Sequence, residues 1–544
     1  MKRIVAAWLI ALCATLQGAT RYVTQSGIPP NTNSLAGLNA WTNVSPGDTV
    51  HLVGTFTNQL NLAGISGTAG NPITFLLEGK FSKPAWGAPY PDAGQTSAAV
   101  YSAAQCSYIV FDGGGTGTFE CTSNGYGRAF TNNAWGMSVA VKNNFELKGV
   151  RMSNILYRVS SPTLLVNCES GRGVRLESTD ATNILIHDCI FDMVGNAVEI
   201  THSGSYSNIQ VYSNTIFNVS FGVSWNAGAT PGQGYNAGIW GNYIEPRDAF
   251  NPEGGPCAGT YHNCGIKVEG ALGGVTNHSF GVYRNDIGHN FPIGTAGIAF
   301  TPNNYISGWT NTYIVNNRLT SGTNTTYVSV DTTNSQSITS GWILAGMPGN
   351  TIVANNTIIS TLGAGKSVAI WEGCQVINNL SYNVGAFMDL AQPSSEFDCS
   401  TNTLCYRPWT NCVSDFNVWY GVQAATMDYF GVWDTNTVLA DYRVNRATWS
   451  EWTNRWHFDP FGITNRPDIN TNTGVLLASD TVATIRGSNL TAYALALNIP
   501  ALTNDFFGAG RPATGRWTIG AIQDTNTTPD PPAATTSLRF FLRR

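Results

Sequence analysis

The stretch NTYIVNNRL at Asn311–Leu319 is one copy of a phrase that recurs along this chain. An alternating apolar run is followed by Asn and then by another apolar residue. Alternation with a period of two predicts a β-strand, and the Asn predicts a turn after it. Six further copies are NILIHDCI at Asn183–Ile190, NIQVYSNTI at Asn208–Ile216, AGIWGNYI at Ala237–Ile244, SFGVYRNDI at Ser279–Ile287, NTIVANNTI at Asn350–Ile358 and CQVINNLSY at Cys374–Tyr382. Repetition of one strand–turn unit predicts a β-solenoid.

The spacing of the Asn-type position favours a parallel β-helix. Its successive gaps are 26, 28, 43, 32, 39 and 23 residues, at Asp188, Asn214, Asn242, Asn285, Asn317, Asn356 and Asn379. The shorter gaps suit one coil of such a helix, and the longer gaps suit a coil that carries a loop insertion. The repeats are rich in Val, Ile, Tyr, Thr, Asn and Gly and poor in the residues that helical repeats prefer.

The recurring Asn has a structural explanation. Asn tolerates a left-handed backbone and bonds neighbouring backbone groups, so it suits a tight bend between two sheets. Stacked coils place one Asn above the next, and such ladders bond along the axis. We therefore expect a structural role for these asparagines.

Segments near both ends carry a resemblance to a known family. They are YVTQSGIPPNTNSLAGLNAWTNVSPGDTVHLVG at Tyr22–Gly54, SGTAGNPITF at Ser66–Phe75 and DFFGAGRPATGRWTIGAI at Asp505–Ile522. Together with the repeats, they resemble the right-handed parallel β-helix proteins of the pectate-lyase-like superfamily. The resemblance implies an all-β fold, a right-handed parallel β-helix solenoid with N- and C-terminal caps.

Composition bounds the class of protein and its partners. The chain has 544 residues, of which 42% are hydrophobic and 11% charged, so it can bury a long core. A net charge of −5 is small for this length and argues against nucleic acid as a partner. Beyond the N-terminus, the sequence has no apolar stretch of the length that a membrane span requires. We expect a monomer.

The N-terminus is typical of a secretory signal peptide over residues 1–19. Lys2 and Arg3 precede the apolar run Ile4–Leu16, and Ala19 suits the cleavage position. The protein is therefore expected to be secreted or held at the cell surface.

An even number of cysteines remains after Cys13 is removed, which permits disulfides. One candidate disulfide joins Cys257 and Cys264. Further candidates lie in the group Cys374, Cys399, Cys405 and Cys412. Cys168 and Cys189 either form a disulfide or are stacked buried thiols.

The composition and the repeat pattern of the sequence divide the chain into segments. Residues 20–100 are predicted to form an N-terminal cap and the first coils, and residues 101–385 the core of the β-helix. Residues 386–525, rich in Trp and Cys at their start, are predicted to form the last coils and a C-terminal cap, which an open solenoid end requires. Residues 526–544 are predicted to be a flexible tail.

Reactive side chains concentrate in the segment Asn251–Asn290, within the coil that has the longest gap. A loop inserted on a rigid scaffold is a common place for a site. In CGIKVEG, Ile266 and Val268 pointing inward would place Lys267 and Glu269 outward. We expect Lys267 and Arg284 to lie on adjacent turns of one exposed surface.

The resemblance implies roles for these residues. Many β-helix polysaccharide lyases use Lys or Arg as the base that removes the proton at sugar C5, while cations or Ca²⁺ neutralise the uronate carboxylate. On this reading Lys267 is the base and Arg284 the neutraliser or proton donor, with His278 or His289 helping, and Ca²⁺ is a possible cofactor. The expected substrate-binding residues are His262, Glu269, Trp225, Trp240, Tyr261 and His187. The alternative is that the charged residues only solvate an exposed sheet.

A second group of polar residues leaves another reaction open. It contains Arg172, Arg175, Glu177, Asp180, His187, Asp188, Asp192, Glu199 and His202. A carboxylate pair such as Asp188 and Asp192 would suit a glycoside hydrolase of the β-helix type. The sequence therefore favours a polysaccharide lyase acting on a uronate-containing chain, with a hydrolase or a non-catalytic glycan-binding surface protein as alternatives.

Overall fold

The computed structural model describes residues 18–27, 33–40, 44–84, 86, 98–122, 134–155, 171–227, 232–245, 264–269, 275–288, 296–301, 309–320, 341–345, 349–360, 366–370, 374–384, 386–390, 412–421, 430–432, 445–447, 449–455 and 457–523. The chain forms two compact units. Unit 1 holds the residues up to His202 together with Tyr206–Thr215. Unit 2 holds Ser203–Ser205 and the residues from Ile216 onward.

Unit 1 is built of parallel strands and one short helix. Its elements are β1 (Thr20–Thr24), β2 (Asn33–Ser34), α2 (Leu35–Leu38), β3 (Thr49–Phe56), β4 (Leu60–Asn61), β5 (Ile73–Lys83), β6 (Val100–Asp112), β7 (Thr118–Cys121), β8 (Trp135–Lys148), β9 (Arg151–Ile155), β10 (Arg172–His187) and most of β11 (Ile190–Tyr212). Ser34 caps α2 by accepting a hydrogen bond from the Gly37 N–H.

The long strands of unit 1 bend from one sheet into the next. Sheet A1 pairs the first halves of β6, β8 and β10, and sheet B1 pairs their second halves, with β5 beside β6. Sheet C1 pairs the end of β5 with β7, then β9, then the start of β11. In sheet A1, Tyr101, Ser138 and Arg175 share one register position.

Unit 2 repeats a coil of three strands. Its elements are β12 (Thr215–Ala227), β13 (Gly232–Trp240), β14 (Tyr243–Glu245), β15 (Cys264–Glu269), β16 (Val275–Tyr283), β17 (Asp286–Gly288), β18 (Ala296–Thr301), β19 (Trp309–Val315), β20 (Arg318–Thr320), β21 (Gly341–Ala345), β22 (Gly349–Ala354), β23 (Thr357–Ile359), β24 (Lys366–Ile370), β25 (Gln375–Ile377), β26 (Leu380–Tyr382), β27 (Ala386–Leu390), β28 (Val413–Asp415), β29 (Val418–Tyr420), β30 (Phe430–Val432), β31 (Asn445–Ala447), the π-helical turn η6 (Glu451–Arg455), α3 (Thr491–Leu497) and the 3₁₀ turn η7 (Pro500–Thr503).

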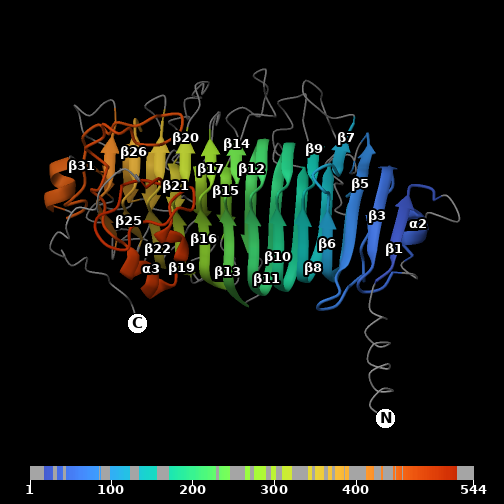
Figure 1. Ribbon diagram of the computed structural model, residues 1–544. Helices are drawn as coiled ribbons and strands as arrows, with labels where there is room; N and C mark the ends of the chain where they lie inside the picture. Colours follow the sequence, from blue (N-terminus) through green and yellow to red (C-terminus); the bar gives the residue numbers. More distant parts are fainter. Residues whose placement is uncertain are drawn as a thin grey trace, which may run out of the picture. The chain divides into compact units, whose positions relative to one another are not determined.

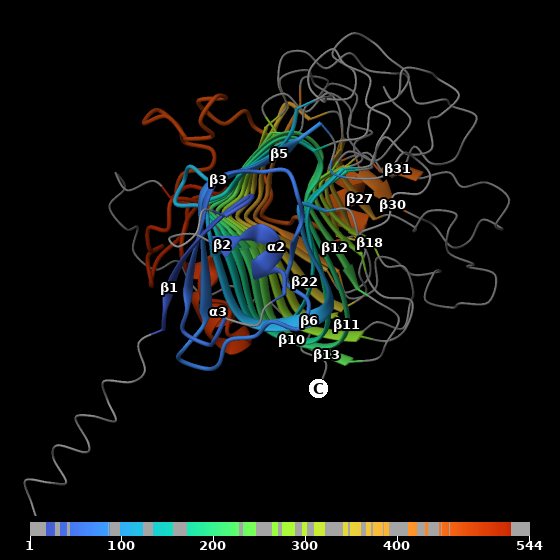
Figure 2. The same ribbon diagram turned by 90° about the vertical axis from the view of Figure 1, so that its right-hand side faces the viewer.

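Every third strand of unit 2 pairs in parallel, which makes three sheets. Sheet A2 runs β12, β15, β18, β21, β24, β27 and β30; sheet B2 runs β13, β16, β19, β22, β25 and β28; sheet C2 runs β14, β17, β20, β23, β26 and β29. The labels of sheet B2 follow one another in Figure 1, and strands of sheet A2 lie together in Figure 2. The all-β parallel β-helix predicted from the repeat is confirmed.

The alternation in each strand separates core from surface as expected. Ile266 and Val268 of β15, Val282 of β16 and Ile314 of β19 have no exposed surface. Because side chains alternate across a strand, their neighbours in sequence face outward.

An asparagine ladder runs along unit 2 beside sheets B2 and C2. Each side chain donates from Nδ2 to Oδ1 of the Asn one coil further on: Asn242 to Asn285 at 3.0 Å, Asn285 to Asn317 at 3.0 Å, Asn317 to Asn356 at 3.0 Å, Asn356 to Asn379 at 2.9 Å and Asn379 to Asn417 at 3.1 Å. All six residues are buried. The predicted ladder is confirmed, and it extends to Asn417.

The left-handed residue of each bend precedes the ladder residue. Arg284, Asn316 and Asn355 have φ of 57°, 57° and 54°, whereas the ladder asparagines that follow them do not have positive φ. The expectation that the ladder Asn itself adopts the left-handed backbone was wrong. Its amide instead satisfies backbone groups across the bend; that of Asn356, for example, donates to the Ile314 carbonyl at 2.8 Å.

The placement of Asp188 at the Asn-type position was also wrong, by one residue. Asp188 has φ of 54°, which is the bend position. The next residue, Cys189, donates its backbone N–H to Asn214 Oδ1 at 3.1 Å, as the ladder asparagines do with one another. Cys189 therefore holds the ladder place in its coil, with a thiol where other coils have an amide.

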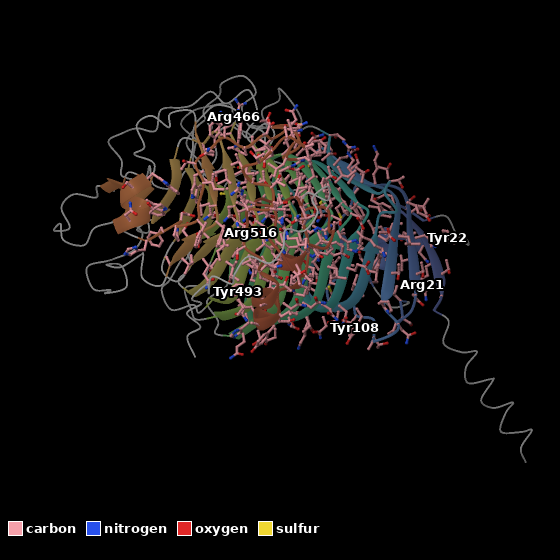
Figure 3. The ribbon with its side chains drawn as sticks, turned by 60° about the vertical axis from the view of Figure 1, so that its left-hand side comes forward. Arg21, Tyr22, Tyr108, Arg466, Tyr493 and Arg516 are labelled. Carbon is pink, nitrogen blue, oxygen red and sulfur yellow. The ribbon has the colours of Figure 1, made fainter. Side chains whose placement is uncertain are left out.

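The C-terminal segment, residues 457–523, packs on the outward side of sheet B2. Leu490, Tyr493 and Leu497 of the α3 region, with Leu502 and Trp517, cover the side chains of Val315, Ile352, Ala354 and Ile377. Tyr493 is labelled in Figure 3. The buried Arg511 guanidinium fixes this segment by donating to the Gly520 carbonyl at 2.7 Å and to Asn316 Oδ1 at 3.1 Å.

Cys106, Cys121 and Cys189 are buried thiols, and burial raises the pKa of each to about 12. The cysteine pairings predicted from the sequence involve Cys168, Cys257, Cys399 and Cys405, which lie outside the described residues. Within the part of the chain that the structure describes, no helix is both long and apolar enough to span a bilayer.

Candidate functional site

Lys267 lies on the outward side of sheet A2, as the alternation predicts. Its neighbours in register are Ser224 of β12 and Ala299 of β18. Its Nζ lies 5.5 Å from the centroid of the Phe221 ring. The face of an aromatic ring attracts a cation, so this contact holds the side chain beside Phe221.

His278 pairs in register with Tyr235, on the strands β16 and β13. Their rings stack with centroids 4.9 Å apart and planes inclined by 13°. Tyr235 is 46% exposed, and its hydroxyl hydrogen-bonds Gln233. This stack presents an aromatic surface to solvent, in sheet B2 and not in the sheet of Lys267.

Arg284 lies at the bend between β16 and β17. Its Nε donates to the Phe506 carbonyl at 3.0 Å, and its guanidinium lies against Gly508. The expectation that Lys267 and Arg284 lie on adjacent turns of one surface was wrong, because Lys267 lies in sheet A2 and Arg284 lies at the bend after the sheet B2 strand of the same coil. The guanidinium of Arg284 instead holds the C-terminal segment.

The two tryptophans expected to bind substrate differ in exposure. Trp225 has no exposed surface, and its ring packs edge-on against Phe280 at 4.9 Å. It faces inward with its register neighbour Val268, so its expected role as an exposed sugar-binding ring was wrong. Trp240 is half-buried and stacks on Tyr283, with centroids 5.8 Å apart.

The remaining residues of the predicted site are not placed by the structure. His262, Tyr261 and His289 lie outside the described residues, and so does the side chain of Glu269, whose backbone ends β15. The roles predicted for them stay predictions.

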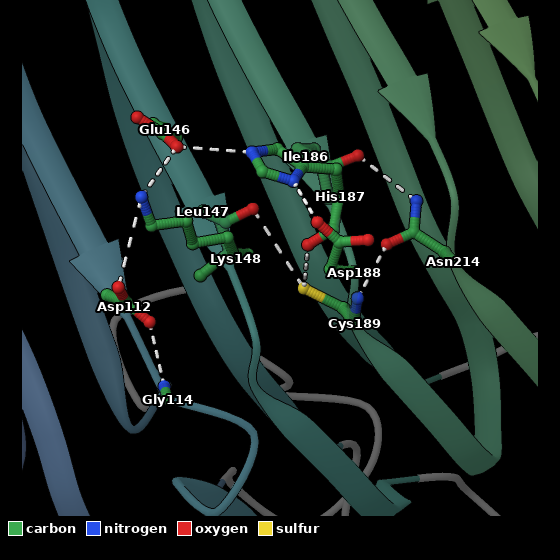
Figure 4. Close-up of polar contacts among 10 residues, drawn as sticks. All are labelled: Asp112, Gly114, Glu146, Leu147, Lys148, Ile186, His187, Asp188, Cys189 and Asn214. Atoms are coloured by element: carbon green, nitrogen blue, oxygen red, sulfur yellow. Dashed lines mark hydrogen bonds and ion pairs between the residues drawn. The ribbon is translucent and has the colours of Figure 1, made fainter.

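His187, at the end of β10 in unit 1, lies in a charged network (Figure 4). Its Nδ1 is 2.6 Å from Asp188 Oδ2, and its Nε2 is 3.1 Å from Glu146 Oε1. Lys148 approaches Glu146 at 3.0 Å, and the Tyr212 ring stacks on the imidazole at 4.6 Å. Both ring nitrogens thus face carboxylates, which holds the imidazole in one orientation.

The carboxylate pair suggested for hydrolysis is divided between elements. Asp188 stands at the bend after β10 and bonds His187, whereas Asp192 lies in β11 and pairs with Arg151 at 3.3 Å. Each carboxylate already has a positively charged or imidazole partner. This arrangement explains both residues as parts of the surface of unit 1.

The start of sheet A1 and the adjacent part of β11 carry a group of charged and aromatic side chains. We call it the Trp135 cluster; it comprises Trp135, Arg172, Arg175, Glu177, Asn196 and Glu199. The Arg172 and Arg175 guanidinium carbons lie 5.8 and 5.1 Å from the centroid of the Trp135 ring. Arg172 forms an ion pair with Glu199 Oε2, and Arg175 Nε lies 3.6 Å from Glu199 Oε1.

Strand register brings this cluster together. Trp135 and Arg172 are paired neighbours on β8 and β10, and the Asn196 N–H donates to the Gly171 carbonyl at 2.9 Å. Gly173 allows the strands to approach, since a Cβ there would lie 2.6 Å from the Ala197 carbonyl oxygen. Three coils therefore contribute side chains to one place.

The two carboxylates of the Trp135 cluster differ in exposure. The Glu199 side chain is 6% exposed and also accepts from Asn196 Nδ2 at 3.3 Å. The Glu177 side chain is 36% exposed and contacts Arg175 Nη2 at 2.6 Å. Glu199 is thus a buried anchor for both guanidiniums, while Glu177 is a partner that solvent or a ligand can reach.

Sequence reasoning found the charged residues of this cluster but missed Trp135 and Asn196. Neither lies in a copy of the repeat phrase, and only the stacking of coils reveals that they meet. His202, from the same predicted group, is buried, and burial lowers its pKa to about 4, so its imidazole is neutral near pH 7. Among the described residues, no group of three or more His, Cys, Asp or Glu is placed to hold a metal ion.

Neither a protein-family model nor a curated protein matches this chain. Solved structures do match it. Pectate lyase Pel9A is 13% identical, with 93% of this chain and 96% of that chain covered and a TM-score of 0.38. The PL6 family polysaccharide lyase Pedsa3628 from Pseudopedobacter saltans is 11% identical, with coverages of 85% and 96% and a TM-score of 0.41. XylC in complex with xylose is 10% identical, with coverages of 92% and 98% and a TM-score of 0.38. The strand pairing carries the fold assignment.

Proposed function

We propose that this protein binds a uronate-containing polysaccharide and cleaves it by β-elimination. The observation that carries the proposal is the Trp135 cluster, in which two guanidiniums are held over an indole ring on a β-sheet face. Trp135 is 4% exposed and its ring lies under both guanidiniums, so it orients them. Guanidiniums bind carboxylates with two parallel hydrogen bonds, and a uronate presents such a carboxylate.

The chemistry requires stabilisation of a developing negative charge. In β-elimination a base removes the C5 proton, electron density moves toward the uronate carboxylate, and the bond from C4 to the leaving oxygen breaks to leave a C4–C5 double bond. A guanidinium bonded to the carboxylate stabilises the carbanion-like state. Arg175 suits this role because its partner Glu177 is exposed enough to be replaced by a substrate carboxylate.

Glu199 supports this role of Arg175 from its buried position in the Trp135 cluster. It is buried and approaches both guanidiniums, so it fixes their positions before a ligand arrives. A group held in place in advance loses less conformational freedom on binding. Glu199 is therefore a positioning residue in this proposal.

Lys267 remains the base that the sequence predicts, and it belongs to an alternative site in unit 2. It lies outward in sheet A2 beside the Phe221 ring. Because it belongs to unit 2, its role is tested separately from that of the Trp135 cluster.

A requirement for Ca²⁺ and a signal peptide over residues 1–19 also remain proposals. Chelation during the assay tests the requirement for Ca²⁺. The N-terminal sequence of protein recovered from the medium tests the signal peptide.

The experiment compares the wild type with Arg175→Ala and Lys267→Ala on alginate, polygalacturonate and hyaluronan. A lyase produces an unsaturated uronate that absorbs ultraviolet light, and Arg175→Ala is expected to lower its rate of formation at least about a hundredfold. A loss of that size in Lys267→Ala alone would assign the reaction to unit 2 instead. New reducing ends without that absorbance would indicate a hydrolase instead. Binding without any new ends would indicate a glycan-binding surface protein.

A further inference from the structure

Besides the Nε atoms of Arg172 and Arg175, which face the Glu199 carboxylate, two polar atoms in the Trp135 cluster are buried without a hydrogen-bond partner. They are Nε1 of Trp135 and Oδ1 of Asn196, and the two residues are 4% and 5% exposed. A buried donor or acceptor left unpaired costs roughly 1–3 kcal/mol, so proteins rarely retain one without a reason. Here one atom is a donor and the other an acceptor.

The two residues flank the start of β10, one on β8 and the other on β11. Trp135 pairs in register with Arg172, and the Asn196 backbone bonds Gly171, the residue just before it. The other groups of these side chains are engaged, since the Trp135 ring underlies the guanidiniums and Asn196 Nδ2 donates to Glu199. The orientation of each side chain is thus fixed while one polar atom remains unsatisfied.

We propose that Trp135 and Asn196 bind neighbouring hydroxyl groups of one sugar ring, the indole N–H as donor and the amide oxygen as acceptor. A hydroxyl both donates and accepts, so a vicinal pair satisfies both atoms, which a carboxylate, having only acceptors, does not. The inference rests on the proposed function, which places the carboxylate of the same sugar on Arg175. Trp135 and Asn196 then determine specificity for the ring hydroxyls.

The test uses an oligosaccharide with and without its carboxylates. The probe is the tightest-binding oligosaccharide cut from alginate, polygalacturonate or hyaluronan, together with its carboxyl-reduced form, which keeps the ring hydroxyls and lacks the charge. Titration calorimetry measures the affinity of the wild type and three variants. Trp135→Phe removes the N–H and keeps a ring, Arg175→Ala removes a cation, and Ser178→Ala is the control.

Ser178 is a matched control because its Oγ is also buried without a partner, further along the same strand β10. Trp135→Phe is expected to weaken both probes by the same factor, roughly tenfold for one hydrogen bond. Arg175→Ala is expected to weaken only the charged probe, and Ser178→Ala neither. Because the smaller ring leaves a gap in a buried site, the unfolding midpoint of Trp135→Phe is expected to fall, and the titrations are run at a temperature at which all variants are folded.

Three results would overturn the inference. They are unchanged affinity of Trp135→Phe for both probes, a loss confined to the charged probe, or no binding of the carboxyl-reduced probe to the wild type. The proposed reaction fails separately: if no unsaturated product forms while Trp135→Phe still weakens both probes, the sugar site stands and the lyase does not.

Discussion

Asn417 donates a hydrogen bond from Nδ2 to Oδ1 of Asp459 at 2.7 Å, and this contact ends the asparagine ladder of unit 2. Asp459 is completely buried, and its Oδ2 accepts from Ser414, Trp419 and Trp452 at 2.5, 3.1 and 3.0 Å. Every amide in the ladder donates in the same direction, toward this carboxyl. Hydrogen-bonded chains of this kind polarise one another, so the last acceptor receives the strongest donor.

Replacing a middle member of the ladder is expected to destabilise the protein. Asn356→Ala removes the bonds to Asn379 Oδ1 and the Ile314 carbonyl, and leaves the Asn317 amide without its acceptor. The free energy of unfolding is expected to fall on the order of 3 kcal/mol, the range for a broken buried network. Urea denaturation followed by circular dichroism measures it.

A second, exposed set of asparagines supplies the control. Asn183 donates to Asn144 Oδ1 at 2.9 Å and accepts from Asn208 at 2.6 Å, on the surface of unit 1. Water replaces these bonds when they are broken, although Asn183 also has φ of 55°, which Ala tolerates less well. Asn183→Gly keeps that backbone accessible and is expected to change stability by less than about 1 kcal/mol. Equal losses in the two variants would contradict the assigned importance of burial.

Asp415 is expected to make stability depend on pH. Burial, reinforced by the nearby Asp459, raises its pKa to about 7, while the N–H groups of Phe461 and Phe416 act in the opposite direction. Because the folded protein retains this proton to higher pH than the unfolded chain, the group's contribution is fully present below about pH 4 and is lost as the pH rises toward about 7. The urea midpoint of the wild type relative to Asp415→Asn is expected to fall across that window. A difference that does not vary with pH would show that Asp415 is ionised in the folded protein throughout.

Two glycines of the C-terminal segment provide a matched pair of substitutions. A Cβ at Gly508 would lie 2.9–3.1 Å from the Arg284 guanidinium, and its φ is 85°. A Cβ at Gly510 meets nothing within 4 Å. Gly508→Ala is therefore expected to loosen the segment and speed its cleavage by trypsin or chymotrypsin, while Gly510→Ala leaves the rate unchanged. Identical cleavage of the two variants would show that Arg284 does not hold this segment.

Glu177 is expected to compete with the substrate. It contacts Arg175 in the free protein and is the more exposed of the two carboxylates in the Trp135 cluster. Glu177→Gln removes that competing charge, so affinity for an acidic oligosaccharide is expected to rise a few-fold while affinity for its carboxyl-reduced form is unchanged. Weaker binding of the acidic probe by this variant would mean that Glu177 contacts the substrate instead of competing with it. Titration calorimetry distinguishes the two.

The repeat phrase predicted the fold because its two signals are local. Alternation identifies the inward residues, such as Ile266 and Val268, and the recurring Asn marks the end of each strand. The same signals placed Asp188 one residue too early, because the amide at that position is replaced by Cys189 and the neighbouring acid resembles Asn. Trp225 was expected among the exposed aromatics, although it follows Phe221 and Val223 at alternate positions and is buried with them.

The candidate site was less predictable, because its residues meet through the stacking of coils. Trp135, Arg172 and Asn196 belong to three coils of unequal length, and the sequence does not show which positions fall into register. Lys267 and Arg284 illustrate the converse. They are close in sequence, yet Lys267 lies in sheet A2 and Arg284 lies at the bend that follows the next strand. The number of residues between two side chains in the sequence does not indicate on which sheet of a β-helix each side chain lies.

The most direct test of the proposed function is the ultraviolet absorbance of the reaction mixture when the purified protein acts on alginate, polygalacturonate or hyaluronan. If the proposed function is correct, absorbance from an unsaturated uronate rises with the wild type on one of these polymers, and Arg175→Ala suppresses the rise. Reducing ends that appear without this absorbance, or an undiminished rise with Arg175→Ala, would contradict it.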